Sequence, residues 1–418
     1  MTPNSAPSAP DLSVEEVQQL LRQQITPITE LESVDLQQAL DRILAQDVIS
    51  PLSVPPHDNS AMDGYAFDGA QLGLVNLALR VVGTALAGRA WSQRLQAGEC
   101  VKIMTGAIMP AGLDTVVPLE FTEREGDTVR FTNHGLQPGA NRRRAGEDLM
   151  AGQPALRAGQ RLTPAALGLL ASLGLTNLTV YRRLRVAYFS TGDEILSLGE
   201  APREGAVYDS NRYTLTGLLA RLGVEVIDMG VVPDQPDAVE AAFERAAREA
   251  DAIVTSGGVS MGDADHTRRT LQRLGQVDFW RIAMRPGRPM AFGHLSAHAS
   301  HSALLFGLPG NPVAAMVTFL VLVRPALIHR MGQTASEPVM LRAMCTEALR
   351  KKPGRTEFPR GVVTVDTQGR LCVRTTGPQG SGLLSSMVQG NGLIVLPHEQ
   401  GSVAVGDEVR VLMLDGLA

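Results

Sequence analysis

The fold is decided by the stretch RVAYFSTGDE, residues 185–194, in which a short apolar run is followed by small and polar residues. Arg185–Phe189 predicts a buried strand, because a short apolar run bounded by turn residues is typical of a strand covered on both faces. The polar residues that follow predict a loop at the carboxyl end of that strand. The same pattern recurs downstream and organises the chain as far as about Gly332.

Alternating hydrophobic patterns continue through this region. Further strands are predicted at about 224–232, 252–255 and 303–306, and helices at about 210–222, 236–250, 267–274 and from 313 onward. This alternation favours a mostly parallel sheet with right-handed crossovers. The most apolar run, Val313–Ile328, is interrupted by Thr318, Arg324 and Pro325, so we expect a buried core helix there and no membrane span.

The flanking regions differ in character. Ser13 and Glu16 form a capping-box pattern that predicts a helix over 12–24, and a second helical pattern covers 32–45. Scattered glycines and prolines with short β-type runs such as 77–82 and 128–131 predict a β-rich module, and the chain turns β-rich again after Gly332, with a last strand within 401–414. The expected domains are an N-terminal helix packed on the α/β domain (1–26), a linking domain (27–50 and 151–182), a β-rich domain (51–150), the α/β domain (183–332) and a C-terminal β domain (333–418).

Composition narrows the function classes. The 418 residues carry a formal net charge of -5, which argues against a nucleic-acid-binding protein. Cys100, Cys345 and Cys372 are far apart and form no C-x-x-C pair, so a disulfide framework is not expected and a reducing cytoplasm is. The first ten residues have no apolar stretch of the kind found in a signal peptide.

Ligands of open parallel sheets bind beyond the carboxyl ends of the strands. Three predicted strands run there into loops of small and polar residues, at 190–194, 256–263 and 307–312. Asn311 is a good N-cap and Pro312 a good first residue for the helix that follows, and such a helix start attracts anions. No Walker motif is present, and no G-x-G-x-x-G follows a strand. These loops predict a phosphate-like or oxyanion ligand outside the common nucleotide-binding classes.

Charged residues of both signs accompany these loops. The acidic ones are Glu194, Asp234 and Asp265, and the basic ones are Arg281, Arg285 and Arg288, the last two in the segment RPGRP at 285–289. Carboxylates would repel a phosphate unless a divalent cation such as Mg²⁺ bridges them, while arginines grip oxyanions bidentately. The alternatives are a solvated hairpin for Arg285 and Arg288, and an N-cap role for Asp234.

The β-rich module contains three polar segments without helical or strand periodicity, 55–66, 102–106 and 142–148. Ordered polar loops of this kind are often functional. The arginine triplet at 142–144 suits either a solvated face or an anion site.

Six motifs in order carry a family resemblance: NSAMDGYA at 59–66, MTGA at 104–107, GED at 146–148, STGDE at 190–194, SGGVS at 256–260 and LPGNP at 308–312. The chain resembles the molybdenum-inserting enzymes of the bacterial MoeA and gephyrin E-domain family from about Leu12 to Val411. The resemblance implies four domains, an elongated homodimer, and a transferase that inserts molybdenum from molybdate into adenylylated molybdopterin. It also implies Mg²⁺-dependent hydrolysis with release of AMP, and a transient contact with the adenylyltransferase that makes the substrate.

The resemblance places the site between the α/β domain of one subunit and the Met-Asp-Gly module of the other. The catalytic residues it implies are Asp63, Thr105, Asp148, Glu194 and Asp265, with Glu194 and Asp265 as metal ligands. The substrate-binding residues it implies are Asp234, Ser256, Gly257, Gly258, Arg281, Arg285, Arg288, Pro309, Gly310, Pro312, Arg360 and Ser381, with Arg360 and Ser381 on the molybdate side. Many family members have lysine where this chain has Arg281, Arg285 and Arg288; oxyanion binding should survive the change, but proton transfer should not.

Three other hypotheses remain open from the sequence. A phosphate-ester hydrolase on the same sheet would explain the glycine-rich loops but leaves the Met-Asp-Gly module unexplained. A gephyrin-like scaffold without turnover would use the fold for binding alone. A zinc site at His294, His298 and His301 would need these residues on one helix face, although they lie between two strand-like segments.

Overall fold

The computed structural model describes residues 11–74, 77–131, 135–257, 265–298, 301–334 and 337–414. These fall into two compact units, the first made of Met1–Glu32, Asp41–Ala45 and Val180–Ala418, and the second of Ser33–Leu40 and Gln46–Thr179. Each unit is described by itself below.

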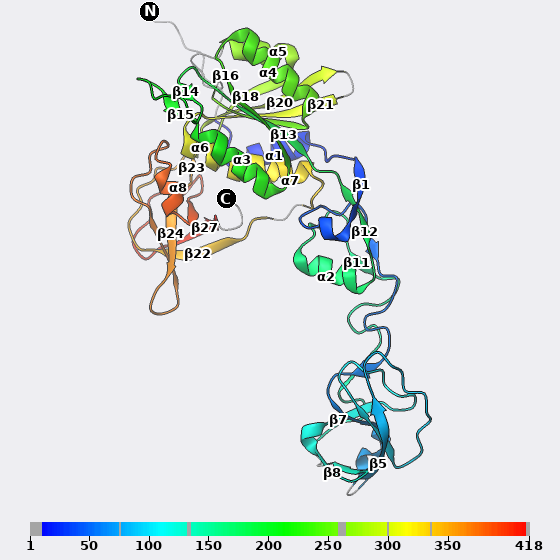
Figure 1. The fold of residues 1–418 in the computed structure, drawn as a ribbon. Helices are drawn as coiled ribbons and strands as arrows, with labels where there is room; N and C mark the ends of the chain where they lie inside the picture. Colours follow the sequence, from blue (N-terminus) through cyan, green and yellow to red (C-terminus); the bar gives the residue numbers. More distant parts are fainter. Residues whose placement is uncertain are drawn as a thin grey trace, which may run out of the picture. The chain divides into compact units, whose positions relative to one another are not determined.

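The first unit is built around a six-stranded sheet with the order β16-β13-β17-β21-β20-β18 (Figure 1). Its strands are β13 (Arg185–Thr191), β16 (Glu225–Val232), β17 (Ala252–Ser256), β18 (Gly275–Arg281), β20 (Pro289–His298) and β21 (His301–Leu308). In that order, the first four strands run parallel to one another. At one edge, β20 pairs antiparallel with β21, and β18 pairs antiparallel with β20. The mostly parallel α/β sheet expected from the sequence is confirmed.

Helices cover both faces of this sheet. They are α1 (Val14–Gln24), α3 (Ser210–Leu222), α4 (Pro236–Glu249), α5 (Asp265–Leu274), α6 (Pro312–Thr318) and α7 (Arg324–Arg330), with a π-helical segment η4 (Phe319–Val323) between the last two. Figure 1 shows α4 and α5 on one face and α1, α3, α6 and α7 on the other. Side chains of β13 alternate between these layers, since Val186 and Tyr188 join the core under α3 while Ala187 and Phe189 join the core under α4.

Two helices illustrate how local sequence sets these elements. At α1, the Ser13 hydroxyl accepts from the Glu16 backbone and the Glu16 carboxylate accepts from the Ser13 backbone, so the predicted capping box is present. The apolar run from α6 to α7 forms one helix of 19 residues, Pro312–Arg330, long and apolar enough to cross a membrane by length and composition alone. Two thirds of its most apolar window (67%) is buried, as expected for a core helix.

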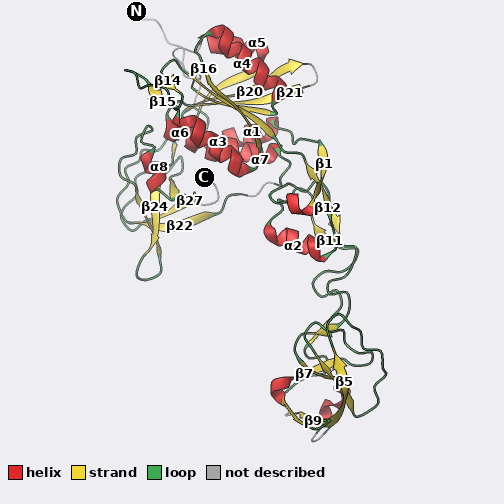
Figure 2. Cartoon of the chain, in the orientation of Figure 1, coloured by secondary structure: helices red, strands yellow, loops and turns green. Residues whose placement is uncertain are grey.

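A C-terminal β domain completes the first unit. It is a closed barrel with the order β22-β25-β24-β26-β27, drawn as arrows in Figure 2. Its elements are β22 (Met340–Cys345), β24 (Arg360–Val365), β25 (Leu371–Thr375), β26 (Gly392–Val395), β27 (Glu408–Met413) and the short helix α8 (Ser385–Gln389). The short strand β23 (Thr356–Glu357) pairs with β19 (Met284–Arg285), which carries the basic turn, so the barrel domain is joined to the turn by backbone hydrogen bonds. Strands β14 (Ile195–Leu196) and β15 (Val207–Tyr208) form a small separate pair.

The second unit is β-rich, as the sequence predicted. Its main sheet has the order β7-β4-β6-β5-β9-β8. The strands are β4 (Gly64–Phe67), β5 (Ala78–Ala85), β6 (Glu99–Ile103), β7 (Thr115–Pro118), β8 (Thr122–Glu125) and β9 (Thr128–Phe131). Smaller pairs join β2 (Val48–Ile49) to β11 (Pro154–Leu156) and β3 (Asn59–Ser60) to β10 (Arg142–Arg143), and helix α2 (Pro164–Ser172) follows.

The helix expected over 32–45 is wrong. The chain forms strand β1 (Leu31–Asp35), which pairs with β12 (Asn177–Tyr181), and then a single 3-10 turn at Leu36–Gln38. The backbone of Asp41 has a φ of 62°, which a continuous right-handed helix does not permit. The periodic leucines at 36, 40 and 44 suggested a helix, but strand pairing and this left-handed residue override that pattern.

Candidate active site

The carboxyl ends of the parallel strands open onto a cavity of ≈ 740 Å³ in the first unit. Its wall is built from four loops that follow strands, from the basic turn and from the barrel domain. The lining residues are Thr191, Gly192 and Glu194 after β13, Asp234 after β16, Gly257 after β17, Pro309–Asn311 after β21 with Ala314, the turn Met284–Pro289, and Arg355, Gln379, Gly380 and Ser381 from the barrel domain. The predicted convergence of strand-end loops is therefore present.

The cavity brings together eight of the residues proposed from the sequence: Glu194, Asp234, Gly257, Arg285, Arg288, Pro309, Gly310 and Ser381. Four others, Ser256, Arg281, Pro312 and Arg360, lie in the same unit but are not among the lining residues. Gly258 lies outside the described residues, as does the side chain of Asp265, the first residue of α5. Asp63, Thr105 and Asp148 belong to the second unit.

Glycine is required where two of the loops meet. Gly257 has a φ of 87°, and a Cβ there would lie 2.4 Å from the Thr191 carbonyl oxygen. The Gly257 amide donates to the Leu308 carbonyl at 3.3 Å, so the loops after β17 and β21 are held side by side. A side chain at this position would be strained at this φ and would press against the end of β13 at Thr191.

The acidic side of the cavity consists of Glu194 and Asp234. The Glu194 carboxylate folds back over Gly192, and both acidic residues are exposed to solvent. The alternative role of Asp234 as an N-cap is wrong, because α4 is capped at Gln235. Among the described residues no group of three metal-binding side chains is preassembled. Two carboxylates are nevertheless the donor set that suits Mg²⁺ when the substrate supplies phosphate oxygens and water completes the shell.

The basic side is divided between free and paired guanidinium groups. Arg285 lines the cavity, and no carboxylate forms an ion pair with it in the described part of the chain. Arg288 also lines the cavity, but its Nε and Nη2 donate to the Asp11 carboxylate at 2.9 and 3.2 Å. Arg281 is paired with the same carboxylate at 3.1 Å. Of the three arginines expected to act alike, Arg281 and Arg288 therefore share the Asp11 carboxylate, and Arg285 has no such partner among the described residues.

Ser256 has a structural partner set and does not reach the cavity. Its hydroxyl lies 2.9 Å from the Tyr188 hydroxyl and 3.2 Å from that of Ser190, and all three side chains are buried. Burial raises the pKa of Tyr188, so this hydroxyl stays protonated. The expectation that Ser256 contacts ligand is not supported by its position; it holds the ends of β13 and β17 together beneath the site.

The helix start after β21 offers less to an anion than the sequence suggested. Asn311 occupies the N-cap position of α6, but its side chain makes no capping hydrogen bond. Pro312 has no N–H, and the Val313 amide donates to the Ser381 carbonyl at 3.0 Å. This bond joins α6 to the barrel domain, and it places Ser381 at the cavity wall while using one of the donors expected to face the ligand.

Arg360 is a buried cation behind the basic turn. It is 1% exposed, and its guanidinium donates to the Ser386 hydroxyl at 2.9 Å and to the Gly380 carbonyl at 3.0 Å. No carboxylate forms an ion pair with Arg360 in the ranges that the structure describes. Burial, with Arg285 nearby, lowers the pKa of Arg360. Arg360 lines a second cavity of ≈ 250 Å³ that shares Arg285, Pro286 and Gln379 with the first.

In the second unit the structure brings Asp63 and Thr105 together. One Asp63 carboxylate oxygen accepts from both the backbone amide and the hydroxyl of Thr105, each at 2.7 Å. These bonds hold the pKa of Asp63 below its ordinary value, so the group is anionic at neutral pH. Gly64, which follows, lies so close to Val117 that a Cβ would meet its carbonyl oxygen at 2.0 Å, and this contact fixes the loop at the start of β4.

The segment with the arginine triplet lies beside that loop. Arg142 and Arg143 pair in β10 with Ser60 and Asn59 of β3. Arg142 forms an ion pair with Asp58 at 3.5 Å, and Arg143 pairs with Glu147. Asp148, two residues beyond Gly146, is exposed. Two of the three arginines are thus paired within their own unit.

The zinc hypothesis loses its geometric basis. His294 and His298 lie on β20 and His301 on β21, so the i, i+4, i+7 spacing does not correspond to one helix face.

Sequence reasoning missed the lining residues Arg355, Gln379 and Gly380, and the role of Asp11. Arg355 follows a Pro-Gly pair in the segment KKPGR at 351–355, a signal similar to that of the RPGRP turn. Its Nε donates to Glu357 at 2.9 Å. Asp11 had no local signal, because its partners lie about 270 positions away in the chain (|i−j| = 277 for Arg288).

Comparisons with known proteins agree with this architecture. Three family models match in succession: "MoeA N-terminal region (domain I and II)" over residues 12–174, "Probable molybdopterin binding domain" over 187–329, and "MoeA C-terminal region (domain IV)" over 342–414. All the lining residues of the larger cavity lie within the second and third of these matches.

Relatives match along almost the whole chain. A molybdopterin molybdenumtransferase of Haemophilus influenzae is 42% identical over 402 residues, covering 96% of this chain and 98% of that protein. One from a Nostoc species is 36% identical over 390 residues, covering 92% and 88%. The crystal structure of the molybdopterin biosynthesis moeA protein from Pyrococcus horikoshii OT3 has a TM-score of 0.82 and 27% identity, covering 96% of this chain and 99% of that one.

Proposed function

The chain belongs to the MoeA family of molybdopterin molybdenumtransferases, and we propose that it inserts molybdenum from molybdate into adenylylated molybdopterin and releases AMP. The observation that carries the proposal is the cavity at the strand ends, because it combines an acidic side, Glu194 and Asp234, with a basic side, Arg285 and Arg288. A substrate with a pyrophosphate link needs both: cations for its phosphate oxygens, and carboxylates for a bridging metal.

We propose that Mg²⁺ is held between Glu194 and the substrate phosphates, with Asp234 or Asp265 as a further ligand. The metal would supply charge neutralisation at the phosphate and a more acidic bound water. Arg285 has no carboxylate partner in the described part of the chain, so its guanidinium is available to grip an oxyanion in the two-pronged manner that arginine favours. Because arginine keeps its proton, its role is binding and orientation.

The molybdate side is proposed at the second cavity. A buried guanidinium without a carboxylate partner is energetically costly, and a bound dianion would offset that cost. Arg360 is such a group, and Arg285 lies between its cavity and the larger one. Molybdate held there would be adjacent to a substrate in the larger cavity. A gephyrin-like scaffold is not favoured, because the relatives at 42% and 36% identity are named as transferases.

We further propose that the active protein is a homodimer, located in the cytoplasm, in which Asp63 and Thr105 of one subunit complete the site of the other. The Asp63 carboxylate is anionic and rigidly held by Thr105, as a residue that contacts a metal or positions water would need to be. A site shared between subunits predicts that two different inactive variants restore activity when mixed, and a site within one chain does not.

The experiment mixes two inactive variants during co-expression, Asp63→Asn and Glu194→Gln. Each variant alone should lose nearly all activity in a reconstitution assay with molybdate and adenylylated molybdopterin. If the site is shared, half of the dimers are mixed and one of their two sites is intact, so activity should return to about a quarter of wild type. Matched surface variants, Asp127→Asn and Glu204→Gln, should keep full activity. No recovery in the mixture would contradict the shared site, and a fully active single variant would remove that residue from the catalytic set.

A further inference from the structure

The N-terminal segment carries a carboxylate into the basic turn. Asp11 bridges two arginines: its carboxylate forms an ion pair with Arg281 at 3.1 Å and accepts from Nε and Nη2 of Arg288 at 2.9 and 3.2 Å. The segment is fixed by backbone bonds on both sides of Leu12, which donates to the Arg281 carbonyl at 2.8 Å and accepts from the Ala283 amide at 2.7 Å. Asp11 is thereby held in place independently of its ion pairs.

The paired arginines are partly exposed. The side chain of Arg288 is 56% exposed and that of Arg281 is 30% exposed, while Asp11 is 22% exposed. Ion pairs with this exposure are weak and screened by salt. An anion that reaches the cavity can therefore compete with the Asp11 carboxylate for Arg288, which lines the cavity beside Arg285.

We propose that Asp11 is an internal competitor for the oxyanion site: it neutralises Arg281 and Arg288 and so lowers the affinity of the cavity for tetrahedral oxyanions. Arg285 then serves as the first anchor of the ligand, and Arg288 becomes available only when the ligand displaces Asp11. The physical consequence is weaker retention of a product anion such as a nucleoside monophosphate. This inference rests on the proposed function only in placing an oxyanion in the larger cavity.

Removing the charge of Asp11 should change ligand affinity in a direction that distinguishes a competitor from a structural residue. A residue that only supports the fold would weaken ligand binding when replaced, whereas a competing carboxylate strengthens binding when its charge is lost. A single charge within several ångströms of a ligand anion at a partly exposed site corresponds to roughly three- to ten-fold in affinity. The gain should shrink as salt rises, because the Debye length falls to about 8 Å at 0.15 M ionic strength.

The test is calorimetric titration of the full chain with AMP and, in a separate arm, with sodium molybdate. Asp11→Asn should bind one or both anions roughly three- to ten-fold more tightly than wild type at low salt. The arm that gains affinity identifies which oxyanion meets Arg288. Glu15→Gln is the matched control, because it removes the same charge from an exposed position of the neighbouring helix α1 and should leave affinity unchanged.

A second variant tests whether Asp11 acts through Arg288. When Arg288 is replaced by Gln, the further change Asp11→Asn should give a smaller gain, since the main cation that it releases is absent. Unchanged or weaker binding by Asp11→Asn in both arms would overturn the inference, and so would the absence of binding of either anion by both the wild type and Asp11→Asn. A wild type that binds these anions but performs no molybdenum insertion would overturn the proposed function and leave the role of Asp11 intact.

Discussion

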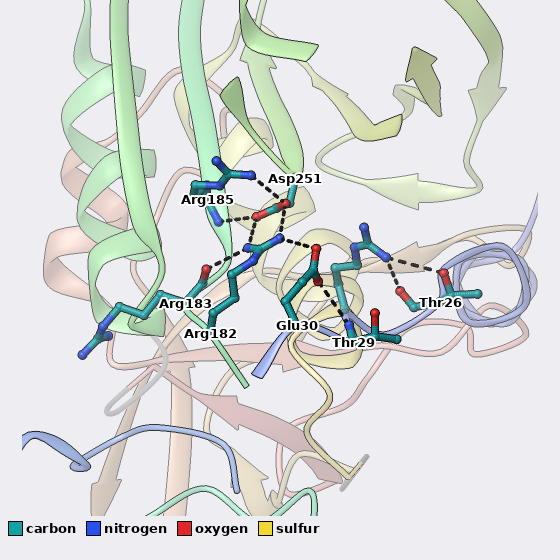
Figure 3. Close-up of polar contacts among 8 residues, drawn as sticks. Thr26, Thr29, Glu30, Arg182, Arg183, Arg185 and Asp251 are labelled. Carbon is teal, nitrogen blue, oxygen red and sulfur yellow. Dashed lines mark hydrogen bonds and ion pairs between the residues drawn. The ribbon is translucent and has the colours of Figure 1, made fainter. Parts of the chain in front are cut away.

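At the scale of single residues, the charged groups proposed to bind ligand are distinct from a buried network that holds the fold. Asp251, which precedes β17, is 1% exposed and receives two N–H groups of Arg182 at 2.7 and 2.8 Å and the Arg185 amide at 2.8 Å (Figure 3). Glu30 contacts the same Arg182 guanidinium at 3.2 Å. This network lies where β13 and β17 begin, at the opposite ends of the strands from the cavity, so its role is structural.

The network predicts a pH-dependent stability. Burial alone would raise the pKa of Asp251, but the bonds from Arg182 and Arg185 outweigh it and leave the pKa below its ordinary value of 3.8. A lowered folded pKa means that the stabilisation is complete above about pH 4 and is lost as the pH falls further. Asp251→Asn should therefore lower the free energy of unfolding by about 3 kcal/mol at pH 7, because it removes the buried charge that pairs with the half-buried Arg182 guanidinium.

The measurement is urea denaturation between pH 3 and pH 7. The loss caused by Asp251→Asn should begin to shrink below about pH 4, because the unfolded wild type then takes up a proton on this carboxylate that the folded state does not. Glu249→Gln, an exposed member of an i, i+4 pair on α4, should change stability by less than about 0.5 kcal/mol. A constant difference across the whole pH range would contradict the role assigned to the ionised carboxylate.

At the scale of elements, the basic turn is set by its packing. Gly287 has a φ of 101°, and a Cβ there would lie 2.2 Å from Oγ1 of Thr318 on α6. The turn also shares a short sheet with β23 of the barrel domain. Arg285 and Arg288 are therefore held on either side of a turn that is pressed against a core helix, which positions them for an oxyanion more precisely than a solvated hairpin could.

Gly287→Ala should weaken AMP binding and lower stability by about 1–3 kcal/mol, because it adds both backbone strain and a steric clash. Gly406→Ala is the matched control: its φ is 91° and nothing lies within 4 Å of the added Cβ, so only the strain remains. The double variant Gly287→Ala with Thr318→Ala should regain part of the lost affinity. Equal effects of the two glycine variants on AMP binding would show that the contact with Thr318 does not position the turn.

Most elements of the α/β domain could be predicted from the sequence. The helix at about 210–222 was placed with its observed bounds, and the structure shows that Asp209 caps its start. The prediction of a helix over 32–45 failed because the apolar pattern there is periodic, whereas pairing with β12 determines the backbone. In the site, motif residues such as Glu194 and Gly257 were found. Arg355 was missed although a Pro-Gly pair precedes it, and Asp11 was missed because only long-range packing brings it to Arg281 and Arg288.

At the scale of the whole molecule, the family match covers both units. The relatives align over 96% and 92% of the chain. The similarity therefore extends over the Met-Asp-Gly loop, the strand-end cavity and the barrel domain. The larger cavity draws residues from the α/β and barrel domains, and the second cavity lies next to it across Arg285 and Pro286. Two adjacent cavities of different size suit the proposed reaction, which needs room for a nucleotide-bearing substrate and for a small oxyanion.

The most direct test of this account follows AMP and molybdenum together in one reaction. Purified protein is incubated with adenylylated molybdopterin, with and without molybdate and Mg²⁺, and both AMP and the molybdenum-containing cofactor are quantified. The account predicts that the two products appear in equal amounts, and that both need molybdate and Mg²⁺. Release of AMP at the same rate without molybdate, and without any molybdenum-containing product, would identify a simple hydrolase of the pyrophosphate link and contradict it.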